Sequence, residues 1–298
     1  MRLPLLLVAA ARMLLANADP ASIPPQIKTM LDAAMASGNE GEVATIVKYA
    51  STAAPDSAKA ITELVNDWKK KRADEKTAKL QDAGFFDLWT GRAELAGYIS
   101  TGNSETEGFS ASLALLRDGL NWRQKIKLQT DYQRSLGVTS REHYLAAWEP
   151  NWKVDDRSYI YGAGQFESDR FLGFTQRYSA SVGAGYSALK TSKLKLDLEL
   201  GPAYRATSFT DGGNERSIAA RGSLDFAWKL GKGLQLTQNA AAYVERYNST
   251  VTGTTALNAK VVGPLSAQFS YNVQYESMPP EGRVTTDTIS RAGLVYAF

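Results

Sequence analysis

Residues 194–200 read Leu-Lys-Leu-Asp-Leu-Glu-Leu, so that every second side chain is leucine and each one between them is charged. Because successive side chains of a β-strand point to opposite faces, this stretch predicts a strand with one apolar and one charged face. The same alternation returns in residues 122–128 and, with aromatic residues, in 265–275. From Trp89 to Phe298 a period of two dominates, which predicts an all-β structure for this part of the chain.

Turn-forming residues divide the alternating region into about twelve segments. The predicted strands lie near residues 89–100, 106–117, 121–135, 141–153, 157–168, 174–188, 193–207, 215–230, 234–248, 252–263, 265–277 and 284–298. Each is long enough to cross a bilayer as a tilted strand, whereas strands of soluble proteins most often have about five or six residues. The lengths therefore favour a membrane barrel over a soluble sandwich.

The connections between these segments alternate in length. Short ones fall at residues 118–119, 155–156, 190–192, 231–233 and 263–264, and longer ones at 101–105, 137–140, 169–173, 210–214, 248–252 and 278–284. Short periplasmic turns and longer external loops are typical of bacterial outer-membrane barrels. We therefore predict an all-β transmembrane antiparallel barrel of about twelve strands, with Phe298 returning to the periplasmic side.

The alternation alone does not say which face meets lipid, because a soluble barrel turns its apolar face inward. Aromatic residues collect near strand ends, where they would form girdles at the two interfaces: Trp89, Trp122, Trp148, Trp152, Tyr178, Tyr186, Tyr204, Trp228 and Tyr296. The other face carries charges of both signs, which can pair with one another and with water in a lumen. These predicted lumen charges are Arg92, Glu94, Arg123, Lys125, Lys127, Asp131, Lys195, Asp197, Glu199, Arg205, Arg221 and Asp225.

Residues 291–298 read Arg-Ala-Gly-Leu-Val-Tyr-Ala-Phe. This ending resembles the C-terminal assembly signal of outer-membrane barrels, in which a polar residue and a glycine precede two alternating aromatic residues. The resemblance implies that the barrel-assembly machinery recognises Arg291, Gly293, Tyr296 and Phe298. Together with the charged face it implies that outer-membrane lipid surrounds the strands.

The N-terminal residues predict export and a helical segment. Residues 1–18 have the features of a signal peptide, with a positive start, an apolar stretch of about nine residues and cleavage after Ala16-Asn17-Ala18. Between residues 23 and about 81 the apolar residues recur every three or four positions, which predicts three amphipathic helices. We assign residues 19–84 to a periplasmic helical segment and 85–298 to the barrel. The helices could bind a periplasmic partner, cover the inner mouth or act as a spacer.

The composition excludes several classes of function. The chain has no cysteine, which rules out thiolate chemistry, and His143 is its only histidine, which rules out a multi-histidine zinc site. Its 34 basic and 31 acidic residues give a net charge of +3 without long blocks of one sign, so we expect no nucleic-acid partner. We also expect no cofactor.

The sequence offers little for catalysis. A barrel enzyme needs a nucleophile, a base and an orienting partner, and we interpret His143 as a solvated lumen or loop histidine near the outer rim. The inner carboxylates are interspersed with Lys and Arg, which favours ion pairs over acid and base roles. Residues 211–214 and Asp169 offer oxygen ligands, but turn chemistry explains them better than calcium binding. We expect no catalytic residue, no metal site and no enzymatic activity.

Residues 88–104 read Leu-Trp-Thr-Gly-Arg-Ala-Glu-Leu-Ala-Gly-Tyr-Ile-Ser-Thr-Gly-Asn-Ser. This stretch, with Asn151-Trp152, residues 166–171 and the closing Phe298, is similar to a family of uncharacterised salt-induced outer-membrane β-barrel proteins. The similarity covers about residues 85–298. It implies a barrel in the outer membrane of a Gram-negative cell and brings no catalytic residue or substrate.

Three functional hypotheses remain open. The first is an integral outer-membrane protein without a defined role, linked to salt or envelope stress only through the resemblance. The second is a narrow porin-like channel for small polar solutes or ions, in which inner charges set the selectivity. The third is an outer-membrane enzyme that acts on lipids at the barrel rim. About twelve strands with many long inner side chains favour a constricted lumen.

Overall fold

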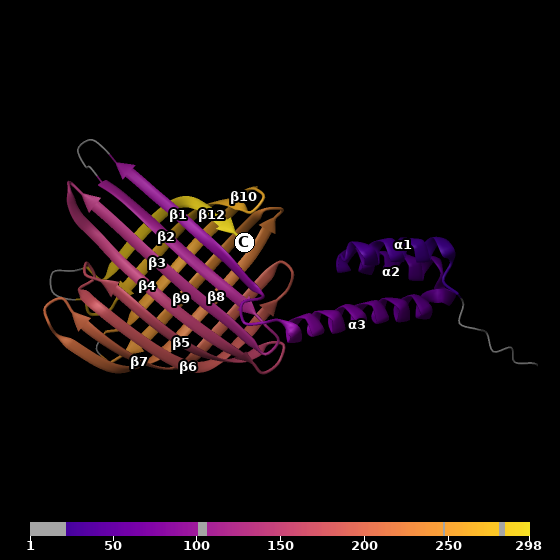
Figure 1. Ribbon diagram of the computed structural model, residues 1–298, viewed down its shortest axis with the longest axis horizontal. Helices are drawn as coiled ribbons and strands as arrows, with labels where there is room; N and C mark the ends of the chain where they lie inside the picture. Colours follow the sequence, from indigo (N-terminus) through magenta and orange to yellow (C-terminus); the bar gives the residue numbers. More distant parts are fainter. Residues whose placement is uncertain (1–21, 101–105, 247, 280–283) are drawn as a thin grey trace, which may run out of the picture. The chain divides into compact units, whose positions relative to one another are not determined.

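The computed structural model describes residues 22–100, 106–246, 248–279 and 284–298 (Figure 1). The expected signal peptide, with Ala16 and Ala18, lies outside these residues. The chain divides into two compact units, Met1–Leu80 and Gln81–Phe298. Each unit is described by itself.

The first unit contains the three expected helices, α1 (Pro25–Ser37), α2 (Glu40–Ala53) and α3 (Ala58–Asp82), with a short 3-10 turn, η1 (Pro55–Ser57), before α3. None of the described helices is both long and apolar enough to cross a membrane. Their apolar faces meet in one core formed by Leu31, Ala34, Val43, Ala50, Ile61 and Val65. Met30 of α1 lies outside this core and is 55% exposed.

The junction between α1 and α2 depends on one side chain. Oδ1 of Asn39 accepts hydrogen bonds from the backbone N–H groups of Gly41 (3.0 Å) and Glu42 (3.3 Å), which have no partner within the helix. Replacing Asn39 with alanine is expected to lower the free energy of unfolding of the helical unit by about 1 kcal/mol. Loss of the 222 nm circular dichroism signal on heating the full chain measures this. Asn39→Asp keeps the acceptor and should melt like the parent; an equal loss in both variants would contradict the capping role.

The second unit is a closed antiparallel barrel in which each strand pairs with its neighbours in sequence and β1 pairs with β12. Its twelve strands are β1 (Trp89–Ser100), β2 (Thr106–Asp118), β3 (Trp122–Ser135), β4 (Val138–Lys153), β5 (Ser158–Asp169), β6 (Phe174–Lys190), β7 (Leu194–Phe209), β8 (Asn214–Gly231), β9 (Leu234–Glu245), β10 (Thr250–Val262), β11 (Leu265–Glu276) and β12 (Thr286–Ala297). The fold predicted from the sequence is confirmed, and every predicted strand is present with its ends within three residues.

One predicted loop is wrong. Residues 137–140 were expected to form a longer connection, but β3 and β4 are joined only by Leu136 and Gly137. Both residues have positive φ, 50° and 75°, as in the tight hairpin turns that match the twist of the flanking strands. Ser140 then lies at a bulge, because Arg134 pairs with Thr139 and Gln133 pairs with Arg141.

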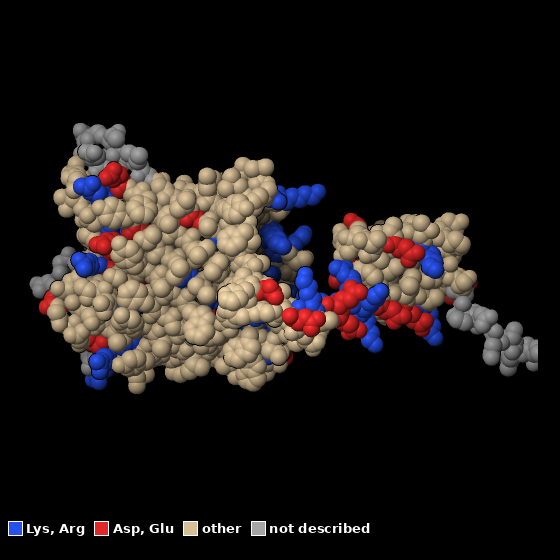
Figure 2. Space-filling view, in the orientation of Figure 1, with Lys and Arg blue, Asp and Glu red and all other residues tan. Residues whose placement is uncertain are grey.

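The outer face of the barrel is apolar and the inner face is charged. Along the middle of the strands the outward positions carry Leu, Val, Ile, Ala and aromatic side chains, among which Leu200 is 68% and Ile218 80% exposed. Figure 2 shows, on the face of the barrel in view, a broad area with few charged side chains, and charged side chains gathered toward its two ends. Outward-facing aromatic residues include Trp122, Trp148, Trp152, Tyr178, Tyr186, Tyr204, Trp228 and Tyr296, each between 42% and 55% exposed.

Candidate functional site

Inner-facing side chains fill much of the lumen. We call the end with the connections at residues 119–121, 154–157, 191–193, 232–233 and 263–264 the short-turn end, and the opposite one the long-loop end. Because the strands alternate, the twelve predicted lumen charges lie on the inner face, and ten of them have polar side-chain partners. Those that form ion pairs belong to two layers, one in each half of the barrel.

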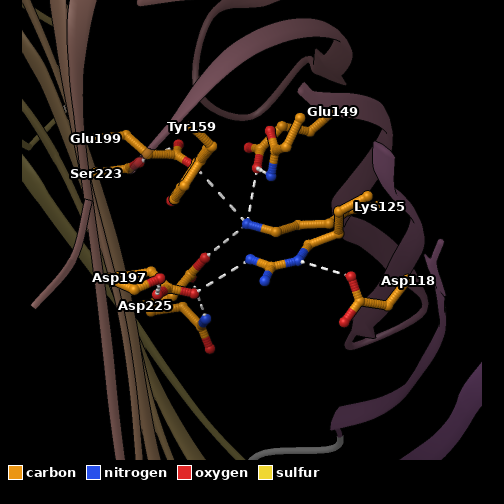
Figure 3. A network of polar contacts seen from close by, with 12 residues as sticks. Asp118, Lys125, Glu149, Tyr159, Asp197, Glu199, Ser223 and Asp225 are labelled. Carbon is orange, nitrogen blue, oxygen red and sulfur yellow. Dashed lines mark hydrogen bonds and ion pairs between the residues drawn. The ribbon is translucent and has the colours of Figure 1, made fainter. Parts of the chain in front are cut away.

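Lys125 is the centre of the layer in the short-turn half (Figure 3). Its ammonium group lies 2.7 Å from Glu149 on β4, 3.1 Å from Asp225 on β8 and 3.7 Å from Glu199 on β7. Arg221 supplies a second cation, 2.8 Å from Glu199 and 3.3 Å from Glu149. Side chains from β3, β4, β7 and β8 are therefore held together across the interior.

The rest of this layer extends the same network. Arg123 bridges Asp118 (3.5 Å) and Asp197 (3.6 Å), and its guanidinium lies over the ring of Tyr159. Tyr159 donates a hydrogen bond to Glu199 (3.1 Å). Further bonds to the carboxylates come from neutral side chains: Ser187 to Asp197 (2.6 Å), Ser223 to Glu199 (2.7 Å) and Asn239 to Asp225 (2.6 Å). Charged groups out of bulk water are stabilised when they are both paired and hydrogen-bonded in this way.

The layer in the long-loop half is centred on His143. Nδ1 of His143 lies 3.0 Å from Asp131, and its Nε2 lies 3.3 Å from Glu167. Asp131 also accepts a hydrogen bond from Arg291 of β12 (2.8 Å). His143 is 5% exposed, so the interpretation of it as a solvated residue is wrong. Two carboxylates face its two ring nitrogens, which suits an imidazolium that donates twice and leaves neither nitrogen to activate a serine.

Two further arginines, Arg177 and Arg205, belong to this layer. Arg177 lies 2.9 Å from Glu276, and its guanidinium stacks on Phe174. Arg205 bonds Glu245 and donates to Thr250 (2.9 Å). These groups are almost fully buried, since the exposures of Arg177, Arg205, Glu276 and Thr250 are 3–4%.

Several partners in these layers were missed from the sequence, namely Glu149, Tyr159, Glu167, Arg177, Glu245 and Glu276. Alternation could have placed some of them on the inner face. Glu149 lies on the same face of β4 as His143, and Glu245 lies on the same face of β9 as Tyr243. Arg92 and Glu94, which were predicted, make only neutral contacts. Arg92 donates to Asn258 (2.9 Å) and Gln268 (3.5 Å), and Glu94 accepts from Ser112 (3.5 Å).

Inner-face lysines outside these layers are unpaired. Lys127 lies two residues from Lys125 on β3, is exposed, and makes no side-chain hydrogen bond or ion pair with a described residue. The same holds for Lys195, Lys229 and Lys260, which face inward near the short-turn end. By contrast, five carboxylates of this half lie in ion pairs: Asp118, Glu149, Asp197, Glu199 and Asp225.

The oxygen-rich loop residues form turns. Oδ1 of Asp169 accepts from the backbone N–H groups of Phe171 (2.9 Å) and Leu172 (3.0 Å), and Oδ1 of Asp211 accepts from Gly213 (2.8 Å). Within the described residues, no group of three or more His, Asp or Glu is arranged to hold a metal ion.

The four residues of the C-terminal signal are divided between the two faces of β12. Arg291 points inward to Asp131, and Gly293 lies against Ala96 of β1, where a Cβ atom would come within 2.7 Å of the Ala96 Cβ. The rings of Tyr296 and Phe298 stack with their centroids 6.3 Å apart, and the Phe298 ring covers Gly91. Backbone bonds of 2.8 and 2.9 Å between Gly91 and Phe298 fasten the end of the chain to β1.

Residues 93–298 match the model of a family described as protein of unknown function, DUF481. The chain belongs to this family. The match runs from β1 to the last residue and leaves the helical unit outside. The expected membership in an uncharacterised barrel family is confirmed, whereas the link to salt stress stays a prediction.

A curated relative of this DUF481 protein is the uncharacterised protein YdiY of Escherichia coli strain K12. The two are 25% identical over 187 residues, which are 62% of this chain and 74% of YdiY. Solved structures similar to the DUF481 barrel include the NanC porin (TM-score 0.42, 14% identity, 70% of this chain and 98% of that one) and an outer membrane channel from Pseudomonas putida F1 (TM-score 0.43, 8% identity, 73% and 100%). Likeness at this level carries no argument about what the DUF481 barrel binds or transports.

Proposed function

We propose that this DUF481 protein is an integral protein of the bacterial outer membrane that forms a narrow, weakly conducting pathway for small polar solutes, with a preference for anions. The observation that carries the proposal is an apolar band outside and unpaired lysines inside. An outward apolar band and a polar interior are the signature of a barrel whose solvent is lipid. The helical unit is then periplasmic, because it precedes β1 at the short-turn end.

The pathway follows the inner-face side chains that stay exposed. The wall around β4 and β5 is filled, since Tyr161 and Asn151 are 0% and 1% exposed. Lys127 of β3, Asn239 of β9 and Arg92 of β1 are exposed on the inner face. In the long-loop half, the side chains of the His143 layer are buried. Conductance should therefore be small, set by rearrangement of that layer and not by a permanently open pore.

The preference for anions follows from the unpaired lysines. Rings of Lys or Arg favour anions in pores, because each charge lowers the energy of a passing counter-ion. Lys195, Lys229 and Lys260 line the short-turn mouth from β7, β8 and β10, while the nearby carboxylates are neutralised in ion pairs. A small anion entering from this mouth meets an uncompensated positive field.

The zero-current potential of the purified protein in a planar bilayer under a KCl gradient tests this. We expect the zero-current potential of the parent to lie closer to the equilibrium potential of chloride than to that of potassium. In the triple variant Lys195→Gln/Lys229→Gln/Lys260→Gln it should shift toward the potassium value. The matched control is Lys193→Gln/Lys232→Gln, which removes exposed lysines of the same turns that lie outside the strands and should change the potential little. Absence of any conductance would favour a plugged structural barrel, and potassium selectivity of the parent would refute the anion preference.

The interactions of this barrel with other molecules remain proposals. Outer-membrane lipid contacts the apolar band, the barrel-assembly machinery reads residues 291–298, and a periplasmic partner binds the helical unit. We propose no enzymatic role, because both nitrogens of His143 face carboxylates and no serine is bonded to it among the described contacts.

A further inference from the structure

The junction where the barrel closes is incomplete. The β1–β12 ladder contains five residue pairs, from Arg92↔Ala297 to Ala96↔Gly293, whereas each of the other eleven junctions contains nine to fifteen. Beyond Ala96, β1 continues to Ser100 paired only with β2. Likewise β12 begins at Thr286 and is paired only with β11 before Gly293.

The gap has a physical cost that points to a use. In hydrocarbon, unpaired backbone N–H and C=O groups are strongly unfavourable because no water can bond them, so barrels normally close completely. The described residues that line a cavity beside the gap include the small residues Gly97 of β1 and Ser290 and Ala292 of β12, together with Ile289 of β12. An opening of this kind is tolerable where polar side chains or a ligand face the free backbone.

A cavity of about 240 Å³ lies at this gap. Its outer lining includes Phe109 of β2 and Phe269 of β11, which are 53% and 56% exposed on the lipid face, with Tyr132 of β3 beside Phe109. Its inner lining includes Asp131 and Arg291. Residues of both barrel faces therefore line one space at the gap.

The inner end of the cavity offers cationic donors. Arg141 lines it, its closest carboxylate, Asp169, is 3.5 Å away, and its buried Nε has no hydrogen-bond partner. Arg291 is the second guanidinium in the lining, and it is paired with Asp131 at 2.8 Å. Aromatic rings on the outer side and two guanidinium groups on the inner side, one of them with an unpartnered Nε, match a molecule with an apolar tail and an anionic head.

We propose that the gap between β1 and β12 is a lateral portal that admits a single-chain anionic amphiphile between the membrane and the lumen. The carboxylate or phosphate head lies by Arg141 and Arg291, and the tail lies against Phe109 and Phe269. This portal rests on the membrane-spanning part of the proposed function but not on its ion conductance. It lies in the long-loop half and so opens toward the outer leaflet.

Photolabelling of the full-length protein in phospholipid vesicles tests the portal. The probes are palmitic acid, lysophosphatidic acid and palmityl alcohol, each with a diazirine near the end of its chain. We expect at least one anionic probe to label the peptides containing Phe109 and Phe269 several-fold more than the alcohol does. The internal control is an apolar groove on the lipid face lined by Trp148, Phe166 and Tyr204, where the three probes should label equally.

The effect of the head group is tested by Arg141→Gln, which should lower labelling by the anionic probes to the level of the alcohol. Arg134→Gln, an arginine of β3 that lines no part of the cavity, is the matched control and should change nothing. The relative labelling by the two anionic probes identifies a carboxylate or a phosphate as the preferred head. Equal labelling by all three probes at Phe109 and Phe269 would overturn the proposal.

A reversible disulfide across the gap, called the lock below, tests passage through it. Because the native chain has no cysteine, only the two introduced cysteines can pair. Continuing the Ala96↔Gly293 register by one residue brings Gly97 opposite Ala292. Oxidised Gly97→Cys/Ala292→Cys should abolish the anionic labelling, and reduction should restore it. Leu95→Cys/Leu294→Cys, at an existing pair, should leave labelling unchanged. Unaltered labelling in the oxidised lock would refute the portal, even where the bilayer conductance of the same protein persists.

Discussion

Replacing Lys125 with methionine is expected to lower the free energy of unfolding of the barrel by about 3 kcal/mol, the cost of leaving buried charges without a partner. Among the described cations, only Lys125 lies within 4 Å of all three carboxylates, those of Glu149, Glu199 and Asp225. Glu199 is 6% exposed, so water cannot replace the ammonium group fully. Arg221 still pairs with Glu149 and Glu199, which is why the expected loss stays well below that of three isolated carboxylates.

Urea titration of the protein in phospholipid vesicles, followed by tryptophan fluorescence, measures this loss. Lys127→Met is the matched control, because Lys127 lies on the same strand and face but has no ion pair, and its stability should change by less than about 0.5 kcal/mol. A double-mutant cycle of Lys125→Met with Asp225→Asn should show a positive coupling, since removing both charges leaves less unpaired. Equal stabilities of the Lys125 and Lys127 variants would show that the network does not hold the strands together.

The contrast between these two lysines shows the limit of what alternation predicts. The period of two places Lys125 and Lys127 on the same face with equal certainty, because it depends only on the backbone. Which of them is paired depends on the partners across the lumen, on β7 and β8, and therefore on the stagger of strands far apart in sequence. The sequence could therefore predict that both lysines lie on the inner face. It could not predict that Lys125 is the centre of the ion-pair network.

The turns and the closure differ in the same way. Most strand ends were predictable because Gly, Pro, Asp and Asn mark them locally. The β3–β4 turn was missed because Leu136, with a positive φ of 50°, gives no such signal. The short ladder between β1 and β12 leaves no local mark either, since both strands continue their alternation past the last pair. Register between the first and last strands is a property of the closed barrel.

His143 illustrates a further limit. The sequence places His143 in the predicted strand 141–153 and favours a solvated lumen or loop histidine, whereas the structure buries it on the inner face of β4. Its carboxylate partners, Asp131 on β3 and Glu167 on β5, come from the two neighbouring strands. Alternation predicted the face of His143, but not that a carboxylate from each neighbouring strand would lie against its ring.

Replacing Leu200 with arginine is expected to destabilise the barrel in a bilayer by about 2–4 kcal/mol, because a lipid-facing arginine near the midplane must be taken out of water. Leu200 lies in the middle of the outward face of β7 and is 68% exposed in the protein itself. A side chain this exposed in a water-soluble protein usually tolerates substitution within about 0.5 kcal/mol. The predicted loss therefore tests whether hydrocarbon surrounds the apolar band.

Val262 provides the matched comparison, since it is 67% exposed and lies at the end of β10, directly before the short turn at Gly263. At this depth an arginine can reach the interface, so Val262→Arg should cost no more than about 1 kcal/mol. Urea titrations of both variants in vesicles give the difference. The parent should also fractionate with outer membranes and migrate differently on gels before and after boiling. Because only a bilayer makes the cost of one charge depend on its height along the barrel, equal costs at Leu200 and Val262 would refute the membrane assignment.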